Sequence, residues 1–186
     1  MVFITNEEIL ETVRMIQSQN LDVRAITMGI SLNECSARDP DKVCERVYEK
    51  VVRSAGRLVP VARELQEKFG VPIVNQRVAV TPIADVMAGG GPEACVKVAH
   101  ALDAAAAEIG IDFVGGFSAQ VQKGFTERDG ALIDAIPQAI SETERVCASV
   151  NVASTRAGIN MDAVVRMAEV LLETSQLTAE IGRAHV

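Results

Sequence analysis

The chain has 186 residues, of which 48% are hydrophobic and 23% are charged, values typical of a folded globular protein and not of a disordered one. Its 25 acidic residues outnumber its 18 basic ones, giving a net charge of -7, and only 3% of its residues are aromatic. Nucleic-acid-binding proteins depend on basic surfaces and on aromatic stacking. We therefore expect no nucleic-acid partner.

Targeting and redox signals are those of a cytoplasmic protein. The first residues lack the basic region, apolar run and cleavage site of a signal peptide, and no uncharged apolar run approaches the roughly 20 residues of a membrane helix. The widely spaced cysteines have no neighbouring histidine cluster, so we expect reduced, mostly buried thiols and no metal site. They are Cys35, Cys44, Cys95 and Cys147. We predict a cytoplasmic location and no membrane partner.

The chain opens with a predicted helix and a predicted strand. Thr5 and Glu8 have the spacing of a capping box, and an apolar stripe with helical spacing follows. A helix is therefore expected from Thr5 to about Asn20. The segment 21–30 is mostly apolar, with Arg24 set among apolar neighbours, and is predicted to be a strand.

A long helix and a second strand come next. Asp39 can cap a helix start, Pro40 fits the first helical turn, and apolar residues keep a helical stripe as far as Gly70. One helix is therefore predicted from Asp39 to Gly70. The second strand is then predicted over the segment 73–80, between Pro72 and the turn at Pro82.

Two more helices and two more strands follow. Gly89–Pro92 opens a helix that ends at Gly110, and a third strand is predicted over Ile111–Phe117. A polar loop leads to a helix around Ile133–Glu144, and the fourth strand is predicted over Val146–Val152. The glycine run before the first of these helices lacks both glycine-rich phosphate motifs, so a flexible turn is expected there.

Asn160 is expected to cap the last helix. The apolar face of that helix comprises Val164, Val165, Ala168, Leu171 and Leu172. Strands that alternate with helices require a mostly parallel α/β sheet, and no linker or repeat divides the chain. We predict a single α/β domain over residues 1–179.

Residues 180–186 carry no helical stripe and have a different predicted origin. Their heptapeptide is what a widely used sequencing-library adapter encodes before a stop codon. The hypothesis is that the natural chain is cut near Ala179 and that the rest is adapter read-through, which leaves His100 as the natural histidine. The alternative is a natural polar tail.

Long motifs occur in one order in the segments 20–30, 72–77, 80–83, 112–119, 121–125, 143–147 and 160–163. Together they resemble the uncharacterised family called domain of unknown function 711, and the similarity runs to about Thr178. The resemblance implies a cytosolic prokaryotic protein of more than twice this length. Its fold would be an α/β barrel like that of pyruvate formate-lyase, with the N-terminal half present here.

The resemblance does not imply glycyl-radical activity. Genes of the family often lie beside a small ACT-domain protein, which is therefore an expected partner. This chain departs from the family by ending early, and the run Gly89–Gly91 is outside the family pattern. A half barrel has two open strand edges and an uncovered face, so aggregation or homo-oligomer formation is expected. A further hypothesis is that the truncated chain has no function of its own.

Polar residues in the first two predicted strands form one candidate ligand site. Strict alternation places three of them on one face of the second strand, namely Asn75, Arg77 and Thr81. Arg24 has a similar mid-strand position, so two guanidinium groups could converge on a carboxylate or a phosphate. The alternative is that each arginine pairs with a nearby acid such as Asp22 or Asp112.

A second group of candidates lies where the third and fourth strands end, because ligands of α/β sheets bind beyond the carboxyl ends of strands. These candidates are Gly115, Gly116, Ser118, Asn151, Ser154, Thr155 and Asn160. Cys147 and Ser149 share one face of the fourth strand with Asn151. The alternative is that turn and cap chemistry explains each residue. Lys123 is a further candidate, for which the alternative is a solvated loop lysine.

Nucleophilic catalysis finds little support in the sequence. Cys147 has no natural histidine to activate it except His100, which is expected to be exposed or hydrogen-bonded on the flank of a helix. The predicted function is an enzyme or binder of a small anionic metabolite, with reaction and cofactor left open. The alternative is a noncatalytic metabolite sensor or a regulatory partner of an ACT-domain protein.

Overall fold

Four parallel strands in the order β1-β2-β3-β4 form the main sheet. The structure is a computed structural model that describes residues 5–18 and 22–179. The strands are β1 (Val23–Ile30), β2 (Ile73–Val80), β3 (Phe113–Gln120) and β4 (Val146–Asn151). Because helices separate these strands along the chain, the predicted α/β class is confirmed. Within the described residues the sheet is open at β1 and β4, so the barrel implied by the resemblance stays a prediction.

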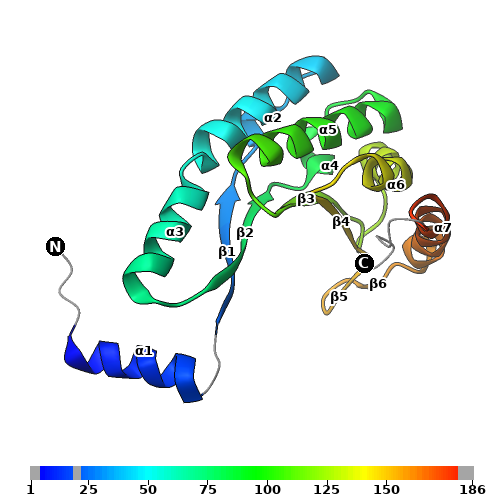
Figure 1. Cartoon of the computed structure of the whole chain (residues 1–186). Helices are drawn as coiled ribbons and strands as arrows, with labels where there is room; N and C mark the ends of the chain where they lie inside the picture. Colours follow the sequence, from blue (N-terminus) through cyan, green and yellow to red (C-terminus); the bar gives the residue numbers. More distant parts are fainter. Residues whose placement is uncertain (1–4, 19–21, 180–186) are drawn as a thin grey trace.

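Helices connect the strands and cover one side of the sheet. They are α1 (Asn6–Ser18), the short η1 (Asn33–Cys35), α2 (Pro40–Ala55), α3 (Leu58–Phe69), α4 (Ile83–Val86), α5 (Gly91–Ile109), α6 (Glu127–Glu142) and α7 (Met161–Leu177). A small hairpin of β5 (Ala153–Ser154) and β6 (Gly158–Ile159) precedes α7. In Figure 1, α2, α5, α6 and α7 follow one another around the outside of the sheet.

None of the described helices combines the length and the apolar character that crossing a lipid bilayer demands.

The hydrophobic core lies between the sheet and the helices α2, α5 and α6. On α2, the completely buried side chains recur at helical spacing, as Val43, Val47, Val51 and Ala55. The sheet meets them with Val78, Val114 and Phe117. Removal of this apolar surface from water is the main stabilising contribution to the fold.

α1 begins directly after Thr5, as predicted, and the Ile9 N–H donates to the Thr5 carbonyl oxygen at 3.2 Å. The helix stands apart from the sheet (Figure 1), and Ile9 and Val13 of its predicted apolar stripe are exposed. These two side chains therefore add nothing to the core. The Glu8 side chain and the predicted helix end at Asn20 lie outside the described part of the structure.

The prediction of one uninterrupted helix from Asp39 to Gly70 is wrong, although both of its ends are right. Asp39 caps α2, and Gly70 ends α3 in the left-handed conformation with φ 68. Between them the helix breaks at Gly56 and Arg57. Pro60 gives the physical reason, because it has no N–H to donate to the Gly56 carbonyl and its ring would clash with that carbonyl in a continuous helix.

A β-bulge at Gly116 decides which side chains of β3 enter the core. Pairing with β4 is regular up to Gly115 and resumes one residue later, at Phe117. The extra residue reverses the alternation, so that Phe117 is fully buried among the helices while Ser118 turns to the opposite face. β3 continues to Gln120, beyond the predicted end at Phe117.

The start of α6 also differs from its prediction, because a capping box was overlooked there. The Thr126 hydroxyl accepts the Asp129 N–H at 3.2 Å, and the Asp129 carboxylate accepts the Thr126 N–H at 2.8 Å. This reciprocal pair satisfies two N–H groups that a helix start leaves free. The helix consequently begins at Glu127, well before Ile133.

The apolar face predicted for the last helix points away from the core. Asn160 does cap α7, as predicted. The fully buried residues of this helix are Ala163, Val170 and Thr174. Most of the predicted apolar face, including Val165 and Leu172, is exposed instead, because α6 packs on the other side of α7.

Candidate functional site

One face of the sheet carries mostly exposed residues, whereas the other packs on helices, and we call the first the open face. Alternation along the strands and the cross-strand register define its members. Its central members are Ala25, Thr27, Gly29, Asn75, Arg77, Ala79, Phe113, Gly115, Ser118, Gln120, Cys147, Ser149 and Asn151. Parallel sheets are normally covered on both faces, so an exposed face of this polar kind indicates a surface that meets a ligand or more protein.

Arg77 supplies the only charge that the four described strands place on the open face. Its guanidinium carbon lies 5.4 Å from the centre of the Phe113 ring. No acidic residue in the described part of the chain forms an ion pair with it. A cation-π contact steadies the planar group and leaves its N–H donors available for an anion.

The predicted convergence of two arginines is wrong. Thr27 pairs with Arg77 across β1 and β2, so Arg24, at an even position of β1, lies on the opposite, helix-covered side of the sheet. The predicted alternative is not found either, since neither arginine forms an ion pair with Asp22 or Asp112 in the described structure. Of the two arginines, Arg77 alone therefore lies on the open face.

Asn75 and Thr81, the other candidates of the second strand, hold β2 against the chain of β1. The Asn75 side-chain amide donates to the Arg24 carbonyl oxygen at 3.2 Å. The Thr81 hydroxyl accepts the Leu32 N–H at 3.0 Å. Because the Asn75 amide nitrogen and the Thr81 hydroxyl are engaged by backbone, Arg77 is the stronger ligand-binding candidate of this strand.

Past the bulge, the open face ends in a row of polar side chains. The Asn151 amide donates to the Gln120 side-chain oxygen at 2.9 Å. Ser149 is exposed beside Ser118, whose buried hydroxyl donates to the Gly116 carbonyl at 3.3 Å. Gln120 is absent from the sequence-based candidates because the predicted third strand ends at Phe117. The glycine pair is the signal for a bulge, which places Gln120 on the open face.

Small residues form a floor between Arg77 and this polar row. Gly29, Ala79 and Gly115 are neighbours across three strands. A Cβ atom on Gly29 would meet no heavy atom within 4 Å, and one on Gly115 would lie 4.0 Å from the Val78 carbonyl oxygen. A ligand can therefore approach the backbone closely over this floor.

Four predicted residues lie away from the open face. The Ser154 hydroxyl accepts the Ala157 N–H at 3.0 Å. The Asn160 side chain caps α7 and donates to a carbonyl of the loop after β3 at 2.7 Å. These are the turn and cap roles of the alternative interpretation. Thr155 and Lys123 are exposed in loops.

A separate cavity of about 540 Å³ lies between the loop 87–91 and the first turns of α6. One guanidinium nitrogen of Arg128 donates to the Met87 carbonyl oxygen at 3.2 Å. Asp134 accepts a bond from Arg166 at 2.6 Å. Arg128 and Asp134 are thus engaged within the protein, and the remaining charge of the cavity is the acidic Glu127, so we place the candidate site for an anion on the open face.

Comparison with known proteins identifies the family. The sequence profile of the family described as Uncharacterised ACR (DUF711) matches residues 14–186. The chain belongs to this family. The resemblance seen in the motifs is thereby confirmed.

The chain is also similar to UPF0210 proteins from three bacteria. It is 53% identical over 174 residues to that of Desulforudis audaxviator, 55% over 171 to that of Limosilactobacillus fermentum and 52% over 173 to that of Listeria monocytogenes. These matches cover 94%, 92% and 93% of this chain and 38% of each relative. This DUF711 chain thus spans about two fifths of the length of the curated relatives it matches. Their sources agree with the prokaryotic origin that the resemblance implied.

The thiols of this DUF711 protein differ in exposure. Burial raises the pKa of Cys95 to about 11, and burial is also the main reason why the pKa values of Cys35 and Cys44 are raised. Such thiols stay protonated at neutral pH and are poor nucleophiles and metal ligands. Cys147 is exposed on the open face, so the prediction of a buried thiol is wrong there. Among the described residues, His, Cys, Asp and Glu form no group of three that could hold a metal ion.

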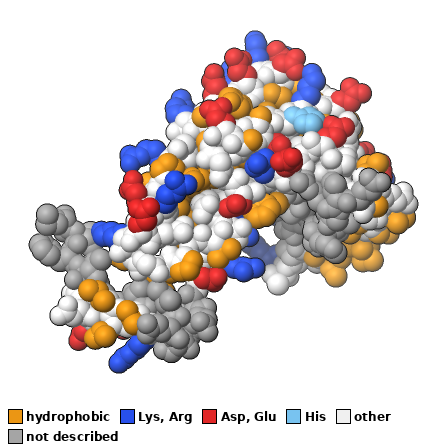
Figure 2. Space-filling model, viewed as in Figure 1, with side chains coloured by type: hydrophobic (Ala, Val, Ile, Leu, Met, Phe, Trp, Pro, Cys, Tyr) orange, Lys and Arg blue, Asp and Glu red, His pale blue; other side chains and the backbone are white. Residues whose placement is uncertain are grey.

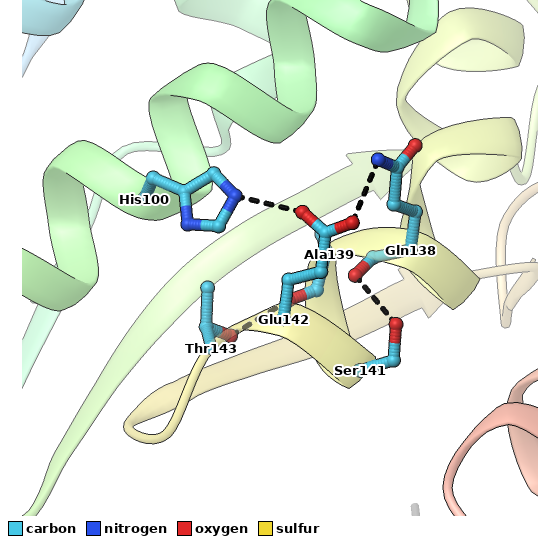
Figure 3. Close-up of polar contacts among 6 residues, drawn as sticks. All are labelled: His100, Gln138, Ala139, Ser141, Glu142 and Thr143. Carbon is cyan, nitrogen blue, oxygen red and sulfur yellow. Dashed lines mark hydrogen bonds and ion pairs between the residues drawn. The ribbon is translucent and has the colours of Figure 1, made fainter.

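His100 of the DUF711 chain is exposed and bound to a carboxylate, as expected for a structural histidine. In Figure 3, its ring on α5 faces Glu142 at the end of α6, with Nε2 2.8 Å from a carboxylate oxygen. The Gln138 amide donates to the other oxygen at 2.8 Å. The nearby Ser141 hydroxyl donates to the Gln138 carbonyl, so it is not aligned with the histidine as a catalytic serine would be.

Replacing Glu142 by glutamine is expected to weaken the fold slightly at neutral pH and not in acid. Hydrogen bonds from Gln138 and His100 lower the pKa of the Glu142 carboxyl. A carboxyl with a lower pKa in the folded state stabilises the fold above its unfolded-state pKa, and this contribution is lost as the pH falls through the folded-state pKa. Because the pair is exposed, the effect is small.

Urea unfolding of the wild type and Glu142→Gln at neutral and at acid pH measures this difference. Glu67→Gln, a change of an exposed carboxylate on α3, is the matched control and should leave stability unchanged. An equal loss in Glu142→Gln at both pH values would contradict the assignment.

Proposed function

We propose that this DUF711 protein binds a small anionic metabolite on its open face, as an enzyme or as a binder, with Arg77 holding the acidic group. One observation carries the proposal. A guanidinium that has no acidic partner among the described residues lies on an otherwise uncharged face of the sheet, beside a floor of small residues. A guanidinium in this setting is suited to a carboxylate or a phosphate, which it can bind through two parallel N–H bonds.

The rest of the open face favours a small ligand with a polar end. The floor of glycine and alanine leaves room for a flat or short molecule, and the row at Ser149, Gln120 and Asn151 offers both donors and acceptors of hydrogen bonds. The row lies toward the carboxyl ends of the strands, where ligands of parallel sheets bind most often. An organic acid with a hydroxyl, amide or carbonyl group fits this arrangement.

Thermal unfolding with a panel of anions tests the proposal. Acetate, succinate, lactate and inorganic phosphate are added separately to the wild type, and the anion that raises Tm most is used to measure Kd. Arg77→Met removes the charge and keeps most of the side-chain length. Hydrogen bonds to charged groups contribute about 1.5–3 kcal/mol, so Kd should rise roughly 10- to 150-fold in this variant.

Arg24→Met is the matched control, because Arg24 is an arginine of the adjacent strand that lies on the other side of the sheet. This variant should keep the affinity of the wild type. An equal loss of affinity in both variants would show a general effect of net charge and would contradict a site at Arg77, as would undiminished binding by Arg77→Met.

A further inference from the structure

The outer side of α7 carries a continuous apolar stripe that nothing in the described structure covers. Met161, Val165 and Leu172 are 62%, 60% and 62% exposed, and Ala168 lies between the last two. Their spacing of three and four residues places all four on one line along the helix. Ile159, just before the helix, extends the apolar surface. Figure 2 shows hydrophobic side chains (orange) gathered at the right, where α7 lies in Figure 1.

The stripe is not the result of a loosely placed helix. The opposite side of α7 is buried against α6, with Ala163 and Val170 almost fully covered. Arg166 adds a link between the two helices, since it donates to Asp134 of α6 at 2.6 Å. α7 is therefore docked on its inner side and is equally apolar on its outer side, which is the pattern of a helix packed between two neighbours.

The stripe adjoins an open strand edge. β4 is the last strand of the sheet, and within the described residues it pairs with β3 alone. In a parallel sheet each strand is followed by a helix that packs on the sheet. The helices that follow two adjacent strands lie side by side. A further strand on the β4 edge would therefore bring its helix against the outer side of α7.

The charges beside the stripe argue against a second copy of α7 as the cover. Three acidic residues lie along one flank of the stripe, namely Asp162, Glu169 and Glu173, and Arg166 pairs with one of them, Glu169, so the flank keeps an excess of negative charge. In an antiparallel pair of identical helices, like flanks face each other, so the acidic rows would repel. The helix that fits is one with an apolar stripe and basic residues along one edge.

The length of the relatives points to the source of that helix. The chain matches 38% of the UPF0210 protein of Limosilactobacillus fermentum, so most of that protein lies outside the matched region. We propose that the outer stripe of α7 is the docking surface for a helix from the part of the family's chain outside these 186 residues. This assignment is independent of the ligand proposed for the open face.

Cysteine labelling in two proteins tests the contact. Leu172→Cys is made in this chain and in a full-length chimera, in which this chain replaces the matched region of the Limosilactobacillus fermentum protein. Ala104→Cys, at an exposed position of the central helix α5, is the control in both. Labelling of each site by a maleimide is followed by peptide mass spectrometry, so that the native thiols are scored separately.

In the short chain, both introduced thiols should react at similar rates. In the chimera, the thiol at position 172 should react at least about tenfold more slowly than the control. This factor is expected when the covered state is about ten times more populated than the uncovered one. Equal rates in the chimera would overturn the proposal. Slowing that appears in both proteins and grows with protein concentration would also overturn it, because a second copy would then be the cover.

A second measurement removes the dependence on a folded chimera. Hydroxyl-radical footprinting of the unaltered Limosilactobacillus fermentum protein reports side-chain accessibility at the positions aligned with Met161, Val165 and Leu172. Low modification of these positions relative to exposed positions of the helix aligned with α5 supports the contact. Modification as high as at those exposed positions would contradict it.

Discussion

Alanine in place of Gly116 is expected to lower the free energy of unfolding by about 3 kcal/mol or more. Gly116 has φ 119, a conformation that residues with a side chain rarely adopt. A Cβ atom there would lie 2.5 Å from Val80 Cγ2 and 2.6 Å from the Val80 carbonyl oxygen. The carbonyl belongs to the neighbouring strand and cannot move aside without breaking the register of the sheet.

The adjacent glycine provides the matched control for this prediction. A Cβ atom on Gly115 would lie 4.0 Å from the Val78 carbonyl, which is ordinary contact, so Gly115→Ala should change stability little. Urea unfolding of the two variants, compared through the midpoint and the slope, measures the difference. Similar stabilities of Gly115→Ala and Gly116→Ala would mean that the bulge does not have the geometry described here.

Replacing Phe117 by alanine is expected to cost about 3–5 kcal/mol. Phe117 is completely buried between the sheet and the helices and is the largest such side chain in the described structure. The loss combines the transfer of a large apolar group with the cavity that remains. The bulge is what brings this ring into the core, so the result also tests the alternation of β3.

Phe113, in the same strand, should respond differently to the same change. It lies before the bulge on the open face and is 38% exposed. Phe113→Ala should cost less than about 1 kcal/mol, as surface substitutions usually do. Equal losses of stability in the two variants under urea, or a larger loss in Phe113→Ala, would contradict the reversed alternation.

Local signals in the sequence predicted most of the helix and strand positions. Asp39 and Asn160 are capping residues whose side chains act within a few residues, so their neighbours suffice to identify them. The second strand is predicted between Pro72 and Pro82, and its bounds, Ile73–Val80, are confirmed. Pro60 also predicts the break before α3, because proline cannot sit in the middle of a helix, although the apolar stripe continues past it.

The candidate site was harder to predict because it depends on contacts between strands. Arg24 is the second residue of β1 and Arg77 the fifth residue of β2, and only the register of β1 against β2 shows that they point to opposite sides. Gln120 lies on the open face because of the bulge in β3. The two adjacent glycines indicate a bulge but do not determine at which residue it occurs. Register and bulges are set by the packing of distant segments, which a local pattern does not contain.

The last helix shows a different limit. An apolar stripe reports that a surface is buried, but not which part of the protein buries it. On α7 the exposed stripe at Val165 and Leu172 was easier to recognise than the inner side, where Ala163 and Thr174 are small or polar yet fully covered. The prediction therefore chose the wrong side of the helix as the one that meets this core.

Titration of the isotope-labelled protein with the anion that stabilises it tests the central claim most directly. The Nε–H resonances of the arginines are assigned and followed by nuclear magnetic resonance. Binding on the open face predicts that the Arg77 resonance shifts with saturation while the Arg24 resonance, on the other side of the sheet, does not. A saturating shift at Arg24 or Arg128 with an unchanged Arg77 resonance would place the ligand elsewhere and contradict the proposed function.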